Sequence, residues 1–212
     1  MFTFVDIFYQ LNFTNTLKRI LSMQKLRSYI ESFATISDQD WLLFSSFLIK
    51  REMPKKHVFL QFGEIESYIS FIERGKVRLF IPHIDVEKER TFGFSFEGEF
   101  VSAYDSFLTQ TPSLYQLQTL ENTILWSINY NNLQNVYQNT QVGNTIGRFV
   151  SEHLFMIKSK REQSLLNETP EQRYLKLFNE RPNVIKEIPL KYIASYIGVT
   201  PQALSCIRRN IF

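Results

Sequence analysis

Several polar residues near the carboxyl end have the types and spacing needed to bind a nucleic acid. Glutamine can form two hydrogen bonds with the edge of an adenine, and arginine can reach a phosphate or a guanine edge. If residues 193–212 fold as two helices joined by a turn, these side chains share the outer face of the second helix. The candidate contacts are Lys191, Thr200, Pro201, Gln202, Ser205, Cys206, Arg208 and Arg209.

The apolar and small residues of the same segment match a helix-turn-helix template. Gly198 falls at the turn, and Ala194, four residues earlier, is small enough for two helices to cross closely. Thr200 and Pro201 suit the cap and first position of the second helix. The predicted inward-facing residues are Ile193, Ile197, Val199, Leu204 and Ile207. The alternative is an ordinary helical hairpin whose polar face is simply solvated.

A long helix is predicted immediately before this region. Residues 142–166 place apolar side chains on one stripe, and that stripe must be buried. The preferred interpretation is a homodimer in which the stripe packs against a second copy of the helix. The alternative is that the stripe packs on the barrel of its own chain. The predicted dimer seam consists of Val142, Ile146, Val150, Leu154 and Ile157.

Short β-rich runs separated by turn residues occupy residues 57–128 and predict an antiparallel barrel or jelly roll. Within it, a hairpin is expected with Gly75 at its bend. Ser37 precedes Asp38 and Asp40 and predicts the start of a helix over residues 38–49. Thr169 and Gln172 have the spacing of a capping box, which predicts another helix start.

Composition limits the other classes of function. Residues 141–212 contain 11 Lys and Arg against 6 Asp and Glu, and the remainder 13 against 15, so the basic excess lies near the candidate contacts. Apolar runs are too short to span a bilayer, so neither a membrane segment nor a membrane partner is expected, and a cytoplasmic location is the simplest. No catalytic set or phosphate-cradling glycine loop is present, so an enzyme is the weakest class.

The chain resembles the Crp/Fnr family of bacterial regulators, in the form common in Bacteroidetes. The matching stretches are GEFVSAYDSF at 98–107, TPEQRYLKL at 169–177 and IPLKYIASYIGVTPQALS at 188–205. The resemblance implies an α+β protein that is a cytoplasmic, homodimeric transcription regulator binding a near-palindromic DNA site, with RNA polymerase as a possible partner. The expected parts are an N-terminal extension (1–22), a cyclic-nucleotide-binding-like antiparallel β-roll of jelly-roll type (23–140), a dimerisation helix (141–167) and a helix-turn-helix domain (168–212). The alternative is a ligand-binding or interaction module that has lost strong DNA binding.

The effector expected from the family is not supported by the residues. In cyclic-nucleotide-binding members a Gly-Glu pair opens a phosphate cassette, and an Arg-Ser pair further on holds the phosphate. Gly98 and Glu99 are present as the candidate effector pocket, but residues 106–118 contain no Arg or Lys. Cyclic AMP and cyclic GMP are therefore not expected, and Gly98-Glu99 is better explained as a turn kept for the fold. The β-roll is therefore expected to bind an unknown small-molecule effector or no effector.

Cofactors of related sensors are not expected either. The three histidines show no clustered spacing for haem, and one cysteine cannot hold an iron–sulfur cluster within one chain. No metal site or other cofactor is predicted.

The lone Cys206 stands where family members usually carry a reading arginine. A thiol is a weak hydrogen-bond donor and cannot replace a bidentate guanidinium. Three interpretations remain: altered DNA specificity, a redox-sensitive thiol, or weakened DNA binding in a diverged paralogue.

Overall fold

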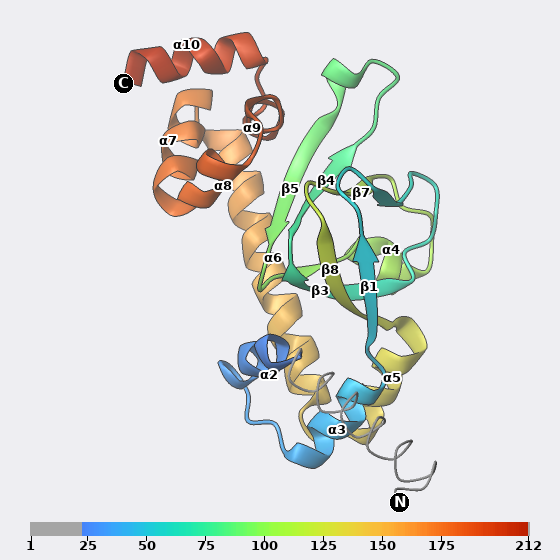
Figure 1. Ribbon diagram of the computed structural model, residues 1–212. Coiled ribbons are helices and arrows are strands. Elements are labelled where there is room, and N and C mark those ends of the chain that lie inside the picture. The colour runs from blue at the N-terminus through green and yellow to red at the C-terminus, as the bar shows by residue number, and fades with distance from the viewer. Residues whose placement is uncertain (1–22, 212) are drawn as a thin grey trace, which may run out of the picture.

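The protein is described by a computed structural model covering residues 23–211 (Figure 1). A β-roll lies beside a long helix, α6 (Gly143–Asn167), which connects a helical group at one end to a second helical group at the other. The predicted N-terminal extension, residues 1–22, lies outside the described residues. Among residues 23–211, no helix is both long enough and apolar enough to cross a membrane.

The β-roll consists of two four-stranded antiparallel sheets, as the sequence predicted. The first sheet has the order β1-β8-β3-β6 and the second β2-β7-β4-β5. A hydrophobic core fills the space between them and includes the completely buried residues Ile72, Val77, Leu117 and Leu125. The strands are β1 (Ile49–Met53), β2 (Val58–Leu60), β3 (Tyr68–Arg74), β4 (Lys76–Ile81), β5 (Arg90–Phe96), β6 (Phe100–Val101), β7 (Gln116–Thr119) and β8 (Thr123–Asn129).

The predicted hairpin at Gly75 is wrong. The strand before Gly75, β3, pairs with β8 and β6, whereas β4 after it pairs with β5 and β7. Gly75 therefore lies where the chain passes from one sheet to the other. Its φ is +117°, and a Cβ there would lie 2.8 Å from the Cα of Thr123. Close backbone approach, rather than a two-stranded turn, explains this glycine.

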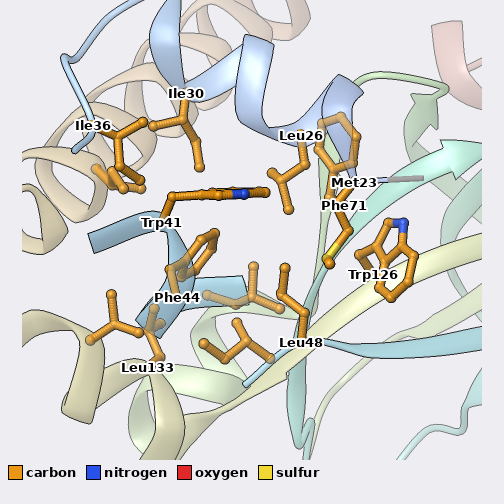
Figure 2. Packing of buried hydrophobic residues seen from close by; sticks show 14 of the residues in the cluster. Met23, Leu26, Ile30, Ile36, Trp41, Phe44, Leu48, Phe71, Trp126 and Leu133 are labelled. Carbon is orange, nitrogen blue, oxygen red and sulfur yellow. The ribbon is translucent and has the colours of Figure 1, made fainter. Parts of the chain in front are cut away.

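The first helical group packs against the first sheet. α2 (Gln24–Glu31) and α3 (Asp38–Ser46) bury the ring of Trp41 between them, with Ile30, Ile36 and Phe44 around it (Figure 2). The Oγ of Ser37 accepts the N–H of Asp40 at 3.0 Å, which confirms the predicted cap. The helix ends at Ser46 rather than at 49, because β1 begins at Ile49.

The same core also includes α5 (Tyr130–Asn139) and the beginning of α6. The predicted long helix is confirmed, with bounds one residue later than expected at each end. Val142 and Ile146 are each only 6 % exposed and belong to this core. These two residues of the predicted seam are therefore buried by their own chain, as the alternative interpretation required.

The second helical group contains α7 (Pro170–Glu180), α8 (Pro182–Glu187), α9 (Leu190–Ile197) and α10 (Pro201–Ile211). Thr169 and Gln172 form the predicted capping box: the Thr169 N–H donates to the Gln172 side chain, and the Gln172 N–H donates to the Thr169 hydroxyl. The group shares one core with Phe94 and Phe96 of β5. In Figure 1, the beginning of β5 lies beside α9, so this helical group rests on the edge of the second sheet. The remaining elements are the short helix α4 (Tyr104–Thr109) and the 3-10 turn η1 (Val86–Lys88).

Candidate nucleic-acid interface and effector site

The helices α9 and α10 form the predicted helix-turn-helix. Gly198 ends α9 with a left-handed φ of +82°, a conformation that glycine adopts without steric cost. The N–H of Val199 donates to Ala194 O at 3.0 Å, and the N–H of Gly198 donates to Ser195 O at 3.2 Å. This bonding pattern is the Schellman motif, and it turns the chain sharply into α10.

The inner face of the motif matches the template. Ile193, Ala194, Ile197 and Leu204 are at most 2 % exposed, while Val199 and Ile207 are partly buried against them. Complete burial of Ala194 fits a position where a larger side chain would push the two helices apart. The pattern of small and branched apolar residues thus fixes how α9 and α10 cross.

All eight predicted contact residues are exposed. Thr200 caps α10, because its Oγ1 accepts the N–H of Ala203 at 3.2 Å. Ser205 donates its hydroxyl to Pro201 O at 3.0 Å, within the same helix. The structure thus brings seven of the residues together at the start and along the outer face of α10, and it places Lys191 near the start of α9. Hydrogen-bonding groups on a rigid exposed helix are what base readout requires.

Cys206 lies among these residues, is exposed, and contacts a guanidinium. An Nη of Arg209, one turn further along the helix, is 3.4 Å from its Sγ. The contact joins Arg209 to Cys206 on the outer face of α10. Among the described residues there is no group of three His, Cys, Asp or Glu side chains that could hold a metal ion.

Glu99, the predicted effector residue, is engaged within the chain. Its Oε2 accepts the N–H of Phe96 at 3.0 Å, and its Oε1 lies 3.2 Å from the Nη2 of Arg181, at the junction of α7 and α8. Arg181 also lies over the ring of Phe96, with its Cζ 5.3 Å from the ring centroid. Gly98, the residue before Glu99, has a φ of +86°, as expected for a turn between β5 and β6. The Gly-Glu pair therefore has a structural explanation here.

A buried carboxylate, that of Glu66, lies beside the segment that leads into α4. Glu66 is only 4 % exposed, and it accepts the N–H of Tyr68 at 3.0 Å and that of Ala103, just before α4, at 3.3 Å. Burial raises the pKa of the Glu66 carboxyl, while these N–H groups and the charge of Arg51 act in the opposite direction. Residues 106–118, where the family pattern would place a cation, contribute no Lys or Arg. An anionic ligand at this position would be poorly compensated.

Aromatic and charged side chains connect α6 to the β-roll. Tyr115 packs edge-on against Phe92 with ring centroids 4.7 Å apart, and its hydroxyl donates to Asp105 Oδ1 at 2.5 Å. The Nζ of Lys158 on α6 lies 4.8 Å from the centroid of Phe92. This side of the β-roll is thus occupied by the chain's own groups.

An open groove lies elsewhere, between α2 and the turn from β5 to β6. Lys25 and Glu97 form an ion pair of 2.6 Å at this groove. Of the two predicted effector residues, Gly98 lines the groove and Glu99 does not. Its lining residues are Gln24, Lys25, Ser28, Tyr29, Ser32, Phe71, Glu97 and Gly98.

The remaining seam residues are progressively more exposed along α6. Val150 and Leu154 are partly exposed, and Ile157 is 49 % exposed. Two apolar neighbours that the stripe did not include, Phe155 and Met156, are 69 % and 52 % exposed. Val150 still packs against the core that contains Val142 and Ile146, so the exposed apolar surface of α6 begins after it, later than the predicted seam.

Sequence reasoning missed the residues that hold the helix-turn-helix in place. Arg181, Arg161 and Arg173 bind acceptors on other elements, and Ser195 binds the edge of β5. Their partners lie 24 to 106 positions away in the chain, so no local spacing indicated them.

Comparison with known proteins agrees with this architecture. The family model "Cyclic nucleotide-binding domain" matches residues 50–140. CooA from Carboxydothermus hydrogenoformans superimposes with a TM-score of 0.64 at 16% identity, covering 82% of this chain and 80% of that one. The c-di-GMP responsive global regulator CLP of Xanthomonas campestris gives 0.63 at 16% identity, covering 82% and 91%.

A protein of Eubacterium rectale, described as a transcriptional regulator of the crp/fnr family, gives a TM-score of 0.62 at 14% identity, covering 82% of this chain and 83% of that one. No curated protein matches the chain by sequence. The resemblance found in the sequence is thus confirmed for the domain and the fold: residues 50–140 form a domain of the cyclic nucleotide-binding family, within a chain that has the fold of Crp/Fnr regulators.

Proposed function

We propose that this protein is a sequence-specific DNA-binding transcription regulator. The observation that carries the proposal is the outer face of α10, where Gln202, Ser205, Cys206 and Arg209 are exposed while Leu204 on the opposite face is completely buried. A recognition helix needs this division, because base edges are read by free side chains on a fixed backbone. The fold shared with Crp/Fnr regulators supports the proposal.

Roles follow from the position of each side chain on the motif. Gln202 and Arg209 are assigned to base edges or phosphates in the major groove, with Thr200, Pro201 and Ser205 beside them. Lys191 and Arg208 are assigned to phosphates. We divide the chain functionally into the β-roll (23–140), the connecting helix (141–167) and the DNA-binding part (168–212), as the sequence suggested.

The protein is further proposed to act as a homodimer through α6. Two copies would present two recognition helices to a near-palindromic site, which is the usual arrangement for this motif. The exposed apolar residues near the middle of α6, with Ile157 at 49 % and Phe155 at 69 % exposure, support this proposal. Val142 and Ile146 are excluded from the seam because they are buried in their own core.

The effector of the β-roll is proposed to be something other than a cyclic nucleotide, or to be absent. The Glu99–Arg181 pair, the buried Glu66 carboxylate and the lack of a cation in residues 106–118 support this proposal. Catalysis is not part of the proposed function.

A second candidate is a module that keeps the fold but has lost strong DNA binding. Cys206 favours it, since a thiol in place of a reading arginine would typically remove about 1–3 kcal/mol of base discrimination per half-site. Substituting Cys206→Arg separates the two candidates. A regulator with altered specificity binds before the change and shifts its preferred sequence after it, whereas a module with lost binding gains affinity only after it.

The experiment that tests the proposed function measures binding to mixed-sequence duplex DNA at several salt concentrations. The slope of log affinity against log salt reports the phosphate contacts, at about 0.9 per contact. Substituting Arg208→Gln together with Arg209→Gln is expected to reduce the slope by about two contacts. The matched control is Lys55→Gln, an exposed lysine in the segment between β1 and β2. Equal slopes for the double variant and the wild type would show that α10 does not face DNA.

A further inference from the structure

The turn between α9 and α10 is held from outside by two arginines that come from different helices. The last four carbonyls of a helix lack partners within that helix. At the end of α9, the Schellman bonds satisfy Ala194 O and Ser195 O. The next carbonyl, Tyr196 O, accepts an Nη of Arg161 from α6, and Ile197 O accepts the Nε of Arg173 from α7 at 2.9 Å.

These contacts are specific to a planar guanidinium. Arg161 lies flat enough over Tyr196 that its Cζ is 4.0 Å from the ring centroid, while an Nη of the same group reaches the backbone oxygen of Tyr196. Arg173 binds two backbone oxygens at once, Ile197 O by its Nε and Glu168 O by an Nη. Both positive charges also lie at the carboxyl end of α9, where the helix dipole favours cations.

The position of this turn determines the direction of α10. Only Gly198, Val199 and Thr200 separate the end of α9 from the start of α10, so a shift of the turn moves the whole recognition helix. Glu168, the second anchor of Arg173, is the C-cap residue that directly follows α6. Both arginines therefore connect the helix-turn-helix to α6 or to its end.

We propose that Arg161 and Arg173 are positioning residues that set the angle between α6 and the recognition helix α10. This inference rests on the proposed function, and it adds that the angle determines which spacing between two DNA half-sites a dimer accepts. Neither arginine is exposed on the outer face of α10, so neither is proposed to touch DNA.

The test uses the full chain carrying Arg161→Gln and a set of duplexes. Each duplex contains the inverted repeat that the wild type selects, with the distance between half-sites changed one base pair at a time. The wild type should prefer one spacing. Arg161→Gln should lose about 2- to 30-fold in affinity at that spacing, the range expected for a residue that acts through another element, and its preference among spacings should flatten or shift. The matched control is Lys160→Gln, the exposed neighbour on α6, which should keep the wild-type ranking.

A merely structural role gives a different result. If Arg161→Gln weakened binding to all spacings by one common factor, or changed nothing, the positioning role would be contradicted. The variant Arg161→Lys keeps the charge but loses the planar contact with Tyr196, and it should recover part of the affinity with a spacing preference still flatter than that of the wild type.

Hydrogen exchange separates this inference from the function on which it rests. In the free protein, Arg161→Gln should speed amide exchange in α9 and α10 while leaving α2 and α3 unchanged, and Lys160→Gln should do neither. If the wild type selected no DNA, the proposed function would fail, whereas the anchoring of the turn would not be affected. The anchoring would be overturned if Arg161→Gln left amide exchange in α9 and α10 unchanged.

Discussion

The carboxylate of Glu99 and the guanidinium of Arg181 lie 3.2 Å apart and join the turn between β5 and β6 to the junction of α7 and α8. The side chains are 46% and 32% exposed, so solvent screens the pair and its contribution to the free energy of unfolding should be below about 1 kcal/mol. Its importance is geometric. Glu99, the residue predicted to line an effector pocket, contacts the helical group that carries α10.

Cyclic AMP should therefore leave the thermal midpoint of the protein unchanged. A ligand present at 100 times its dissociation constant stabilises a protein by about 2.7 kcal/mol, which thermal unfolding detects easily. No such shift is expected, because Glu99 is already paired with Arg181 and residues 106–118 supply no Lys or Arg for a phosphate. A rise in midpoint with cyclic AMP that disappears in Glu99→Gln would contradict this account of the pocket.

Ser195→Ala should weaken the attachment of α9 to the β-roll. The Ser195 hydroxyl donates to Glu89 O at 2.7 Å and accepts the N–H of Thr91 at 2.9 Å. β5 is an edge strand, so these bonds satisfy backbone groups that its own sheet leaves free. The expected loss in the free energy of unfolding is about 1–3 kcal/mol by denaturant titration. Ser205→Ala, which removes only a bond within exposed α10, is the control, and equal losses in the two variants would count against the attachment.

Tyr137 should make the protein sensitive to alkali. Burial raises the pKa of Tyr137 to about 12, above its ordinary value near 10. A raised pKa means that the folded state holds the proton more tightly, so this stabilisation is present below pH 10 and is lost as the pH rises from 10 to 12. The difference in stability between the wild type and Tyr137→Phe should be constant below pH 10 and then fall. A difference that stayed constant to pH 12 would show that Tyr137 is not protected.

Ile157→Asp should convert a dimer to a monomer. A charge at an apolar dimer contact would be buried without a partner, which typically costs several kcal/mol. Sedimentation velocity at several protein concentrations measures the change. The control is Gln163→Asp, an exposed polar position on the same helix. A wild type that sediments as a monomer throughout would remove α6 as a dimer contact.

Local chemistry made parts of the fold predictable from the sequence. Ser37 and the Thr169–Gln172 pair cap helices as predicted, because a cap is satisfied within three residues of itself. Gly198 was recognisable because a left-handed residue must end α9 there. The β-roll followed from the alternation and turns of residues 57–128, which are also local properties.

Features that depend on distant partners were not predictable. The strand after Gly75 joins the other sheet, and nothing beside Gly75 indicates its closeness to Thr123. Ile146 has the spacing of a dimer seam, yet the first helical group covers it. Arg161 reads in sequence as an ordinary exposed charge, and only the folded chain brings it to Tyr196 O.

The most direct test of the central claim is selection of bound sequences from a random DNA pool by the purified wild-type protein. The expected result is enrichment of an inverted repeat whose half-sites are separated by about one helical turn, with affinity that falls steeply between low and moderate salt. Recovery of a pool with no enriched motif at either salt concentration would contradict the central claim.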